Sequence, residues 1–304
     1  MEQTSMTARI SAFARAYHSE NNTVKIFDDS VARRLLTDAE YEQISRNMTD
    51  GIAFFNPSFV GSGADALRWV VDHQLSPSPL GRAAFAERAL ENAVCIGAAQ
   101  YLILGAGYDT FALRQPRWAD KLQIFELDHP ATASDKRLRL QRAGLAFPAN
   151  VHTVEADFTS AHWLTALTQT SAFDSSRISF CSALGLTYYL AAHTFDALLC
   201  ALSSVLPRGS ALVFDYPDES TGTEQSGERA HKQSMLAKAA NEQMLAGYSC
   251  RDIKQLLAAH GFLVYEHLTP PEITSQYFSV YNQANSAHPM TAFDHVNYCL
   301  AIKQ

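Results

Sequence analysis

The chain has 304 residues, 47% of them hydrophobic, so it is long enough to bury one large core or two smaller ones. Its net charge of −7 without a basic cluster argues against a nucleic-acid surface, and no apolar run approaches the ~20 residues of a membrane-spanning helix. The five scattered cysteines include no CxxC pair and the first residues have no signal-like apolar core, so we expect a cytoplasmic globular protein without structural disulfides, a metal or a membrane partner.

The first third of the chain predicts helices and no convincing strand. Asp28 or Asp29 can cap the first of them, and Ser76-Pro77-Ser78-Pro79 would break the third from the fourth. We expect these helices at about residues 31–36, 38–48, 64–74 and 80–97. We interpret residues 1–98 as a helical cap that closes over a ligand site as a lid, with a passive helical layer as the alternative.

A second pattern begins at Gln100, where strands alternate with helices. Such alternation predicts an α/β domain over residues 99–304, with a mostly parallel sheet covered by helices on both faces. The predicted strands are residues 101–104, 122–127, 151–156, 177–183, 210–215, 262–268 and 297–303. The predicted helices between them are residues 131–142, 162–169, 193–206, 229–246 and 250–260, and the polar segment 217–228 is expected to be a mobile loop.

The stretch QYLILGAGYDT, residues 100–110, is the centre of this pattern. Its apolar strand runs into Gly105-Ala106-Gly107, and a helix opens near Tyr108. Two glycines allow a tight turn and the close approach of a ligand, and the start of a helix offers unpaired N–H groups. The pattern is found in nucleotide binders of several chemistries.

Asp128 and Thr110 narrow the choice of ligand. Asp128 lies roughly 20 residues beyond the glycines, where a doubly wound fold places the acid that binds ribose hydroxyls, although a plain helix cap is the alternative. Thr110 stands where a dinucleotide fingerprint has its third Gly or Ala. This favours a ligand without pyrophosphate, such as S-adenosylmethionine, over NAD(P). An NAD(P)-dependent oxidoreductase is the alternative.

Five segments carry a family resemblance: PLGRAAF (79–85), LGAGYDT (104–110), FELDHPATASDK (125–136), EADF (155–158) and LGLTYYL (184–190). With these segments the chain resembles the leucine carboxyl methyltransferase family, especially its bacterial and fungal members that act on polyketides and other small acids. The resemblance implies a Rossmann-like class I methyltransferase fold, with a seven-stranded sheet whose last strand is antiparallel. It also implies S-adenosylmethionine as methyl donor and S-adenosylhomocysteine as product.

The resemblance also assigns cofactor contacts, which by motif are Arg82, Gly105, Ala106, Gly107, Asp128, His129, Asp157, Phe158 and Leu184. Arg82 would pair with the methionine carboxylate, and Asp128 would accept both ribose hydroxyls. Asp157 and the Phe158 backbone would hold the adenine edge. Leu184 replaces the Glu that the family places near the cofactor's amino group, so that contact must come from elsewhere. A solvated Arg82 and a helix-capping Asp157 are the alternatives.

For the acceptor, the resemblance implies the carboxylate of a small mono- or dicarboxylic acid or polyketide, which becomes a methyl ester in secondary metabolism. A carboxylate with a pKa near ~4 is already ionised and needs no base, only positioning and exclusion of water. A phenol would need a base such as His18, His129 or a tyrosine. We expect the acceptor pocket among Tyr17, His18, Tyr188, Tyr189 and Tyr216.

Some alternatives stay open at this point. Lys25 and Arg33 in the cap could bind an acidic substrate, but surface exposure is the simpler interpretation. Leu184 supports a second alternative, a cofactor-binding protein that has lost catalysis. A homodimer is plausible for this size and class.

Overall fold

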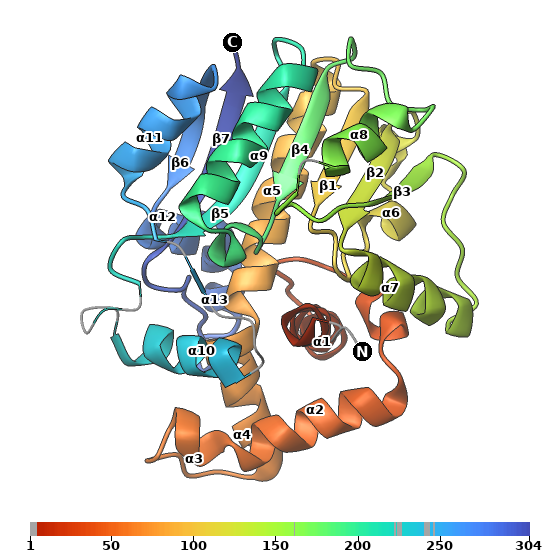
Figure 1. Ribbon diagram of the computed structural model, residues 1–304. Helices are drawn as coiled ribbons and strands as arrows, with labels where there is room; N and C mark the ends of the chain where they lie inside the picture. The colour runs from red at the N-terminus through yellow and green to blue at the C-terminus, as the bar shows by residue number, and fades with distance from the viewer. Residues whose placement is uncertain (1–4, 161, 222, 224–226, 240–243, 246) are drawn as a thin grey trace.

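The computed structural model describes residues 5–160, 162–221, 223, 227–239, 244–245 and 247–304. Its centre is a seven-stranded sheet in the order β3-β2-β1-β4-β5-β7-β6 (Figure 1). The first five strands are parallel, and β7 runs antiparallel to both β5 and β6. The predicted α/β fold, with a mostly parallel sheet and an antiparallel last strand, is therefore confirmed.

The strands begin and end within two residues of the predicted positions. They are β1 Gln100–Leu104, β2 Gln123–Asp128, β3 Val151–Glu155, β4 Ser179–Ala183, β5 Ala211–Pro217, β6 Phe262–Leu268 and β7 Val296–Lys303. All residues of β1, β4 and β5 are buried. This is why their sequences are unbroken apolar runs rather than alternating ones.

Helices cover both faces of the sheet. Tyr101 and Ile103 of β1 belong to a core shared with α5 (Pro77–Cys95), whereas Leu102 and Leu104 belong to a second core with residues of the helices on the other face. The remaining helices after β1 are α6 Phe111–Arg114, α7 Pro130–Arg142, α8 His162–Gln169, α9 Ala192–Val205, α10 Gly227–Ala239, α11 Cys250–Ala259, α12 Pro270–Ile273 and α13 Ser279–Ala284.

The other N-terminal helices lie beyond the ends of the strands on one side of the sheet, together with α10 (Figure 1). They are α1 Met6–Asn21, α2 Asp38–Asp50, α3 Ile52–Phe55 and α4 Gly63–Val70. Arg15 of α1 donates a hydrogen bond of 2.6 Å to the carbonyl oxygen of Tyr108, which follows the glycine turn. The helices of this group therefore cover the carboxyl ends of the parallel strands.

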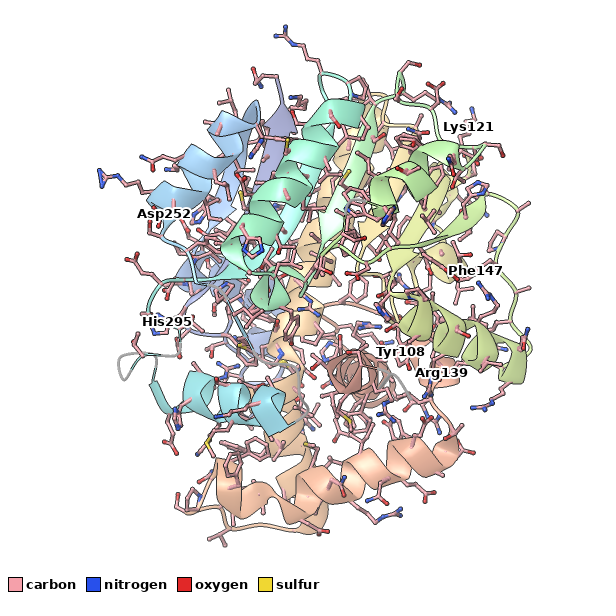
Figure 2. All side chains as sticks on the ribbon, viewed as in Figure 1. Tyr108, Lys121, Arg139, Phe147, Asp252 and His295 are labelled. Carbon is pink, nitrogen blue, oxygen red and sulfur yellow. The ribbon has the colours of Figure 1, made fainter. Side chains whose placement is uncertain are left out.

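Arg139 of α7 connects this helical group to the sheet. Its guanidinium lies over the Tyr108 ring, and it donates to the Glu40 carboxylate of α2 and to the Leu35 carbonyl at 2.7 to 3.0 Å (Figure 2). Arg139 lowers the pKa of Glu40 to about 2. One side chain thus joins α7, the loop after β1 and α2.

Three predicted helices differ from the observed ones. The segment Ser76–Pro79 does not interrupt the helical course of the chain as predicted. The helix α4 continues through a π-helical turn, Val71–Leu75, and Ser76 keeps helical dihedral angles. Pro77 is then the first residue of α5, where a proline is tolerated. The helix near 31–36 is only a 3₁₀ turn, Ala32–Leu35. The helix after the glycines has only four residues, because Pro116 follows it closely.

The predicted loop 217–228 and helix 229–246 fall partly on residues 222, 224–226, 240–243 and 246, which lie outside the described part of the chain. No described helix is long and apolar enough to cross a membrane. Within the described residues, no group of three or more His, Cys, Asp or Glu side chains is arranged to hold a metal ion.

An ion pair fixes α7 to β2 two residues before Asp128. Lys136 donates a hydrogen bond of 2.7 Å to Glu126 Oε2, and both side chains are at least 96% buried. Among described atoms, Glu126 Oε1 has no partner. Burial raises the pKa of Glu126, and the Lys136 charge opposes this rise.

We predict that Lys136→Met lowers the free energy of unfolding by about 3–5 kcal/mol above neutral pH, because Glu126 becomes a buried charge without a counter-ion. The pKa of Glu126 is higher in the folded than in the unfolded protein, so the protein loses stability as the pH rises from the unfolded to the folded pKa. The destabilisation caused by Lys136→Met should therefore be smaller near pH 5, where Glu126 is largely protonated. Urea denaturation at both pH values measures this. Glu126→Gln combined with Lys136→Met should recover most of the stability, and equal losses at both pH values would contradict the account.

Candidate functional site

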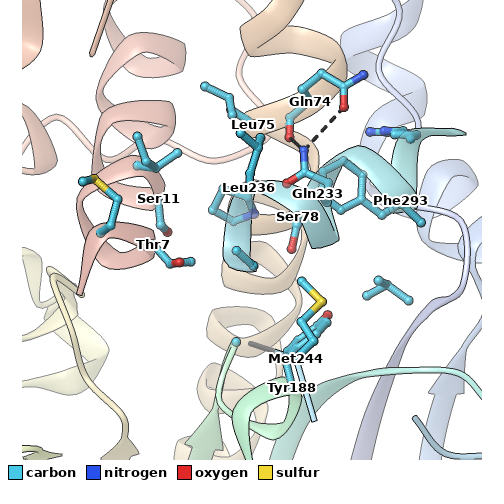
Figure 3. A pocket seen from close by; sticks show the side chains of 18 of the residues that line it. Thr7, Ser11, Gln74, Leu75, Ser78, Tyr188, Gln233, Leu236, Met244 and Phe293 are labelled. Carbon is cyan, nitrogen blue, oxygen red and sulfur yellow. Dashed lines mark hydrogen bonds between the residues drawn. The ribbon is translucent and has the colours of Figure 1, made fainter. Parts of the chain in front are cut away.

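Two cavities adjoin each other at the carboxyl edge of the parallel strands. The larger, of ≈ 680 Å³, lies between α1 and the loops that follow β1, β2 and β4, and we refer to it as the large cavity. The second, of ≈ 300 Å³, is lined from α1, α2, α5, α10 and the segment before β7, and we refer to it as the apolar cavity (Figure 3). The two share one wall, made of Thr7, Ser11, Pro79, Arg82, Gly185 and Tyr189.

The glycine turn forms one side of the large cavity. Gly105 and Gly107 have φ angles of +69° and +47°, in the left-handed region that favours glycine, and Ala106 lines the cavity between them. A Cβ at Gly105 would lie 3.2 Å from the Leu186 side chain. The turn therefore brings bare backbone to the cavity surface, as a close-fitting ligand requires.

Asp128 ends β2 beside this turn. Its Oδ2 accepts a hydrogen bond from the Gly107 N–H, and its Oδ1 accepts one of 2.7 Å from the His129 N–H. Burial raises the pKa of Asp128, and these two donors oppose the rise. His129 also lines the large cavity and caps α7. The carboxylate is thus held rigidly by the backbone, at a place where hydroxyl groups could donate to it.

Asp157 and Phe158 lie at the end of β3, and neither is among the residues that line the large cavity. Asp157 Oδ1 accepts hydrogen bonds from the Thr159 N–H and hydroxyl at 2.9 and 2.6 Å, which lower its pKa. The Phe158 ring packs edge-on against Trp163, with the ring centroids 5.5 Å apart. The structure therefore places these two residues next to the site rather than in its wall.

Arg82 of α5 lies in the shared wall and is held by Asp215 of β5. Its Nη1 is 3.3 Å from Asp215 Oδ2, and Asp215 also accepts from the Gly185 N–H at 2.6 Å and the Tyr188 hydroxyl at 2.9 Å. A Cβ at Gly185 would lie within 3 Å of the Arg82 guanidinium, so a side chain there would displace Arg82 from its place beside Asp215. Leu184, the residue before Gly185, lines the large cavity. Arg82 is thereby fixed where both cavities meet.

Of the five acceptor-pocket candidates, Tyr188 and Tyr189 line the apolar cavity. The other three are not among the residues that line either cavity. His18 is fully buried and accepts a hydrogen bond of 3.0 Å from the Ile26 N–H, and burial lowers its pKa to about 4. The Tyr216 hydroxyl is bonded to His267 at 2.7 Å, and Tyr17 packs against Phe13.

The two cap cations also lie elsewhere. Lys25 pairs with Asp28, and Arg33 pairs with Glu20 and Asp38, all as partly exposed ion pairs. Neither cation lines a cavity. Both are surface residues, as the simpler interpretation of the sequence has it.

A buried network around Asp29 lines the large cavity and was not predicted as part of a site. Asp29 pairs with Arg15 at 2.8 Å and with Arg114 at 3.3 Å, and the Thr110 hydroxyl donates to it at 2.6 Å. The sequence pointed to Asp29 only as a candidate helix cap. In the structure Val31 is the N-cap of the 3₁₀ turn, and Asp29 Oδ1 accepts a hydrogen bond of 3.1 Å from the Ala32 N–H. Thr110 stands where a dinucleotide-binding motif would have its third Gly or Ala, and here it connects the glycine turn to this network.

The apolar cavity has few charged residues. Its walls are mostly aliphatic and aromatic, and Figure 3 shows Leu75, Leu236, Met244 and Phe293 around it. The charged side chains among its described lining are Arg82, Arg229 and Asp294, and this lining includes no histidine or lysine. Neither Arg229 of α10 nor Asp294 of the segment before β7 was predicted as part of a site, because no motif marks these residues.

Comparison with known proteins adds independent information. The leucine carboxyl methyltransferase family model matches residues 8–203. The Bacillus subtilis protein YktD, named as an S-adenosyl-L-methionine-dependent methyltransferase, is 39% identical over 307 aligned residues, which cover 99% of each chain. A Mycobacterium marinum protein of the same name is 28% identical over 239 residues, or 79% of this chain and 73% of the relative.

Two solved structures share the fold at 14% sequence identity. A structure from Thermobifida fusca, described as a methyltransferase, has a TM-score of 0.58 and covers 99% of this chain and 96% of its own. A DUF574 family protein from Streptomyces avermitilis has a TM-score of 0.59 and covers 97% of each chain. The predicted family and cofactor are confirmed by the sequence matches: the chain belongs to the leucine carboxyl methyltransferase family and is an S-adenosylmethionine-dependent methyltransferase.

Proposed function

We propose that this methyltransferase methylates the carboxylate of a small organic acid, giving a methyl ester and S-adenosylhomocysteine. The observation that carries the proposal is the apolar cavity, which meets the large cavity at Arg82 and offers no histidine or lysine in its described lining. Membership of a methyltransferase family sets the NAD(P)-dependent oxidoreductase alternative aside.

The large cavity suits the cofactor in three respects. A backbone-held carboxylate, Asp128, is available for ribose hydroxyls, and the bare turn at Gly105 to Gly107 permits close contact. Arg82 offers a guanidinium for the methionine carboxylate at the wall shared with the apolar cavity. When bound, S-adenosylmethionine supplies an electrophilic methyl group on a sulfonium. With its methionine end at Arg82, that group would lie near the shared wall.

The acceptor side needs positioning rather than proton transfer. The carboxylate oxygen would accept the methyl group that bound S-adenosylmethionine supplies, with the carbon–sulfur electron pair left on S-adenosylhomocysteine, so no residue of this chain would have to move a proton. Burial raises the pKa of Tyr188 well above the usual range, and its hydroxyl already donates to Asp215, so it is a poor general base. For a phenol acceptor, the described lining of the apolar cavity offers as bases only tyrosines and the Asp294 carboxylate, and no histidine or lysine. An ionised acid requires none.

The N-terminal helices would contribute by excluding water. Thr7 and Ser11 of α1 belong to the wall that both cavities share, and Ile44 and Met48 of α2 line the apolar cavity. We therefore propose that residues 1–98 act as a cap on the catalytic domain 99–304. Water excluded from the shared wall could not compete as methyl acceptor.

We predict that Asp128→Asn weakens S-adenosylhomocysteine binding about 10- to 100-fold, because the hydrogen bonds to a charged acceptor are lost. Asparagine still accepts one backbone hydrogen bond, so the turn should persist. Calorimetric titration measures the affinity, with the exposed Asp120→Asn as matched control and NAD as a ligand that should not bind. Unchanged affinity in Asp128→Asn would remove this carboxylate from the site.

A panel of organic acids, analysed by mass gain of one methyl group, tests the reaction itself. We expect kcat/KM to change less than about threefold from about pH 6 to about pH 9, because a carboxylate with a pKa near ~4 is ionised throughout. A rate that rises steeply with pH would indicate a phenol-like acceptor and a base. Cofactor binding with no methylation of any acid would favour the non-catalytic alternative.

A further inference from the structure

Arg229, in the first turn of α10, is a second cation of the apolar cavity. Its guanidinium carbon lies 4.1 Å from the centroid of the Phe293 ring, which also lines the cavity. Unlike Arg82, it is not part of the wall shared with the large cavity. The apolar cavity therefore has one cation, Arg82, in the wall shared with the large cavity and another, Arg229, away from that wall.

The two arginines differ in how their charge is balanced. Arg82 has the buried Asp215 carboxylate as partner. Within the described part of the chain, the hydrogen bonds of Arg229 go to neutral oxygens, the Thr291 hydroxyl and the Thr291 and Ala292 carbonyls, all at 3.2 Å. No described carboxylate forms an ion pair with Arg229, and its buried Nε has no described partner.

A partly buried guanidinium without an ion-pair partner is costly, and Arg229 has no such partner among the described residues. Burial lowers the pKa of Arg229 to about 10, although the nearby negative charge of Asp294 opposes the change. The group is still cationic at neutral pH. Arginine is well matched to carboxylates because its planar N–H groups fit two oxygens at once. An anionic ligand group would supply the ion-pair partner that no described residue provides for Arg229.

We propose that Arg229 binds a second carboxylate of the acceptor, so that the substrate is a dicarboxylic acid and the product its monomethyl ester. This inference rests on the proposed function. One carboxylate would react at the shared wall, and the other would remain unmodified at Arg229. Ile10, Leu75 and Leu236 among the lining residues suit an apolar chain between the two ends. Arg229 would thus determine specificity without taking part in the methyl transfer.

The test compares linear dicarboxylic acids with monocarboxylic acids of equal chain length. Wild-type enzyme should prefer the diacids, and Arg229→Gln should lower kcat/KM for them about 10- to 100-fold while changing the values for monoacids less than about threefold. Arg229→Lys should keep part of the preference because it keeps the charge. The exposed Arg251→Gln serves as matched control, and S-adenosylhomocysteine affinity should stay unchanged in all variants.

The variant series separates recognition from support of the fold. If Arg229 only holds residues 291–292 in place, Arg229→Gln would lower kcat/KM for diacids and monoacids by the same factor. That result would overturn the inference and leave the proposed function standing. Wild-type enzyme that methylates monoacids as well as diacids also overturns it. If no acid of either class is methylated, the proposed function fails first, and the inference fails with it.

Discussion

The buried carboxylate of Asp215 is the group on which the geometry of the site depends. It is fully buried within β5, and the Gly185 N–H, the Tyr188 hydroxyl and the Arg82 guanidinium all donate hydrogen bonds to it. A charge in this environment is tolerated only with such partners. Because these donors come from α5 and from the segment after β4, one carboxylate fixes both sides of the wall between the cavities. Arg82 cannot move toward either cavity without giving up its counter-ion.

A second buried carboxylate, Asp29, closes the large cavity from the helical side. It connects Arg15 of α1 with Arg114 and Thr110 after the glycine turn. Arg139 makes a comparable connection between α7 and α2. The helical group is thus attached to the sheet through ion pairs and hydrogen bonds as well as through apolar packing. The two cavities lie between these attachments, where Asp128, the glycine turn and Arg82 face a ligand.

Much of this could be predicted from sequence. The strands were predictable because β1, β4 and β5 are buried on both faces and their sequences are therefore mostly apolar. Asp128 and the glycines were predictable because they stand at the ends of strands at a known spacing. The roles of Asp215 and Arg229 were not predictable from sequence. Asp215 pairs with Arg82, 133 positions away, and the aromatic ring that contacts Arg229 belongs to a different segment. Pairings of that kind exist only after folding. The predicted homodimer and the role in secondary metabolism stay predictions.

The most direct test of the account is to measure Asp215→Asn for both S-adenosylhomocysteine affinity and kcat/KM toward an accepted acid. The matched control is Asp218→Asn. Asp218 is partly exposed, lies directly after the same strand and pairs with His295. If Asp215 positions the wall between the cavities, both quantities should fall at least about tenfold in Asp215→Asn, because a buried charge loses its partner, and neither should change much in the control. A folded Asp215→Asn enzyme with wild-type affinity and turnover would contradict the account.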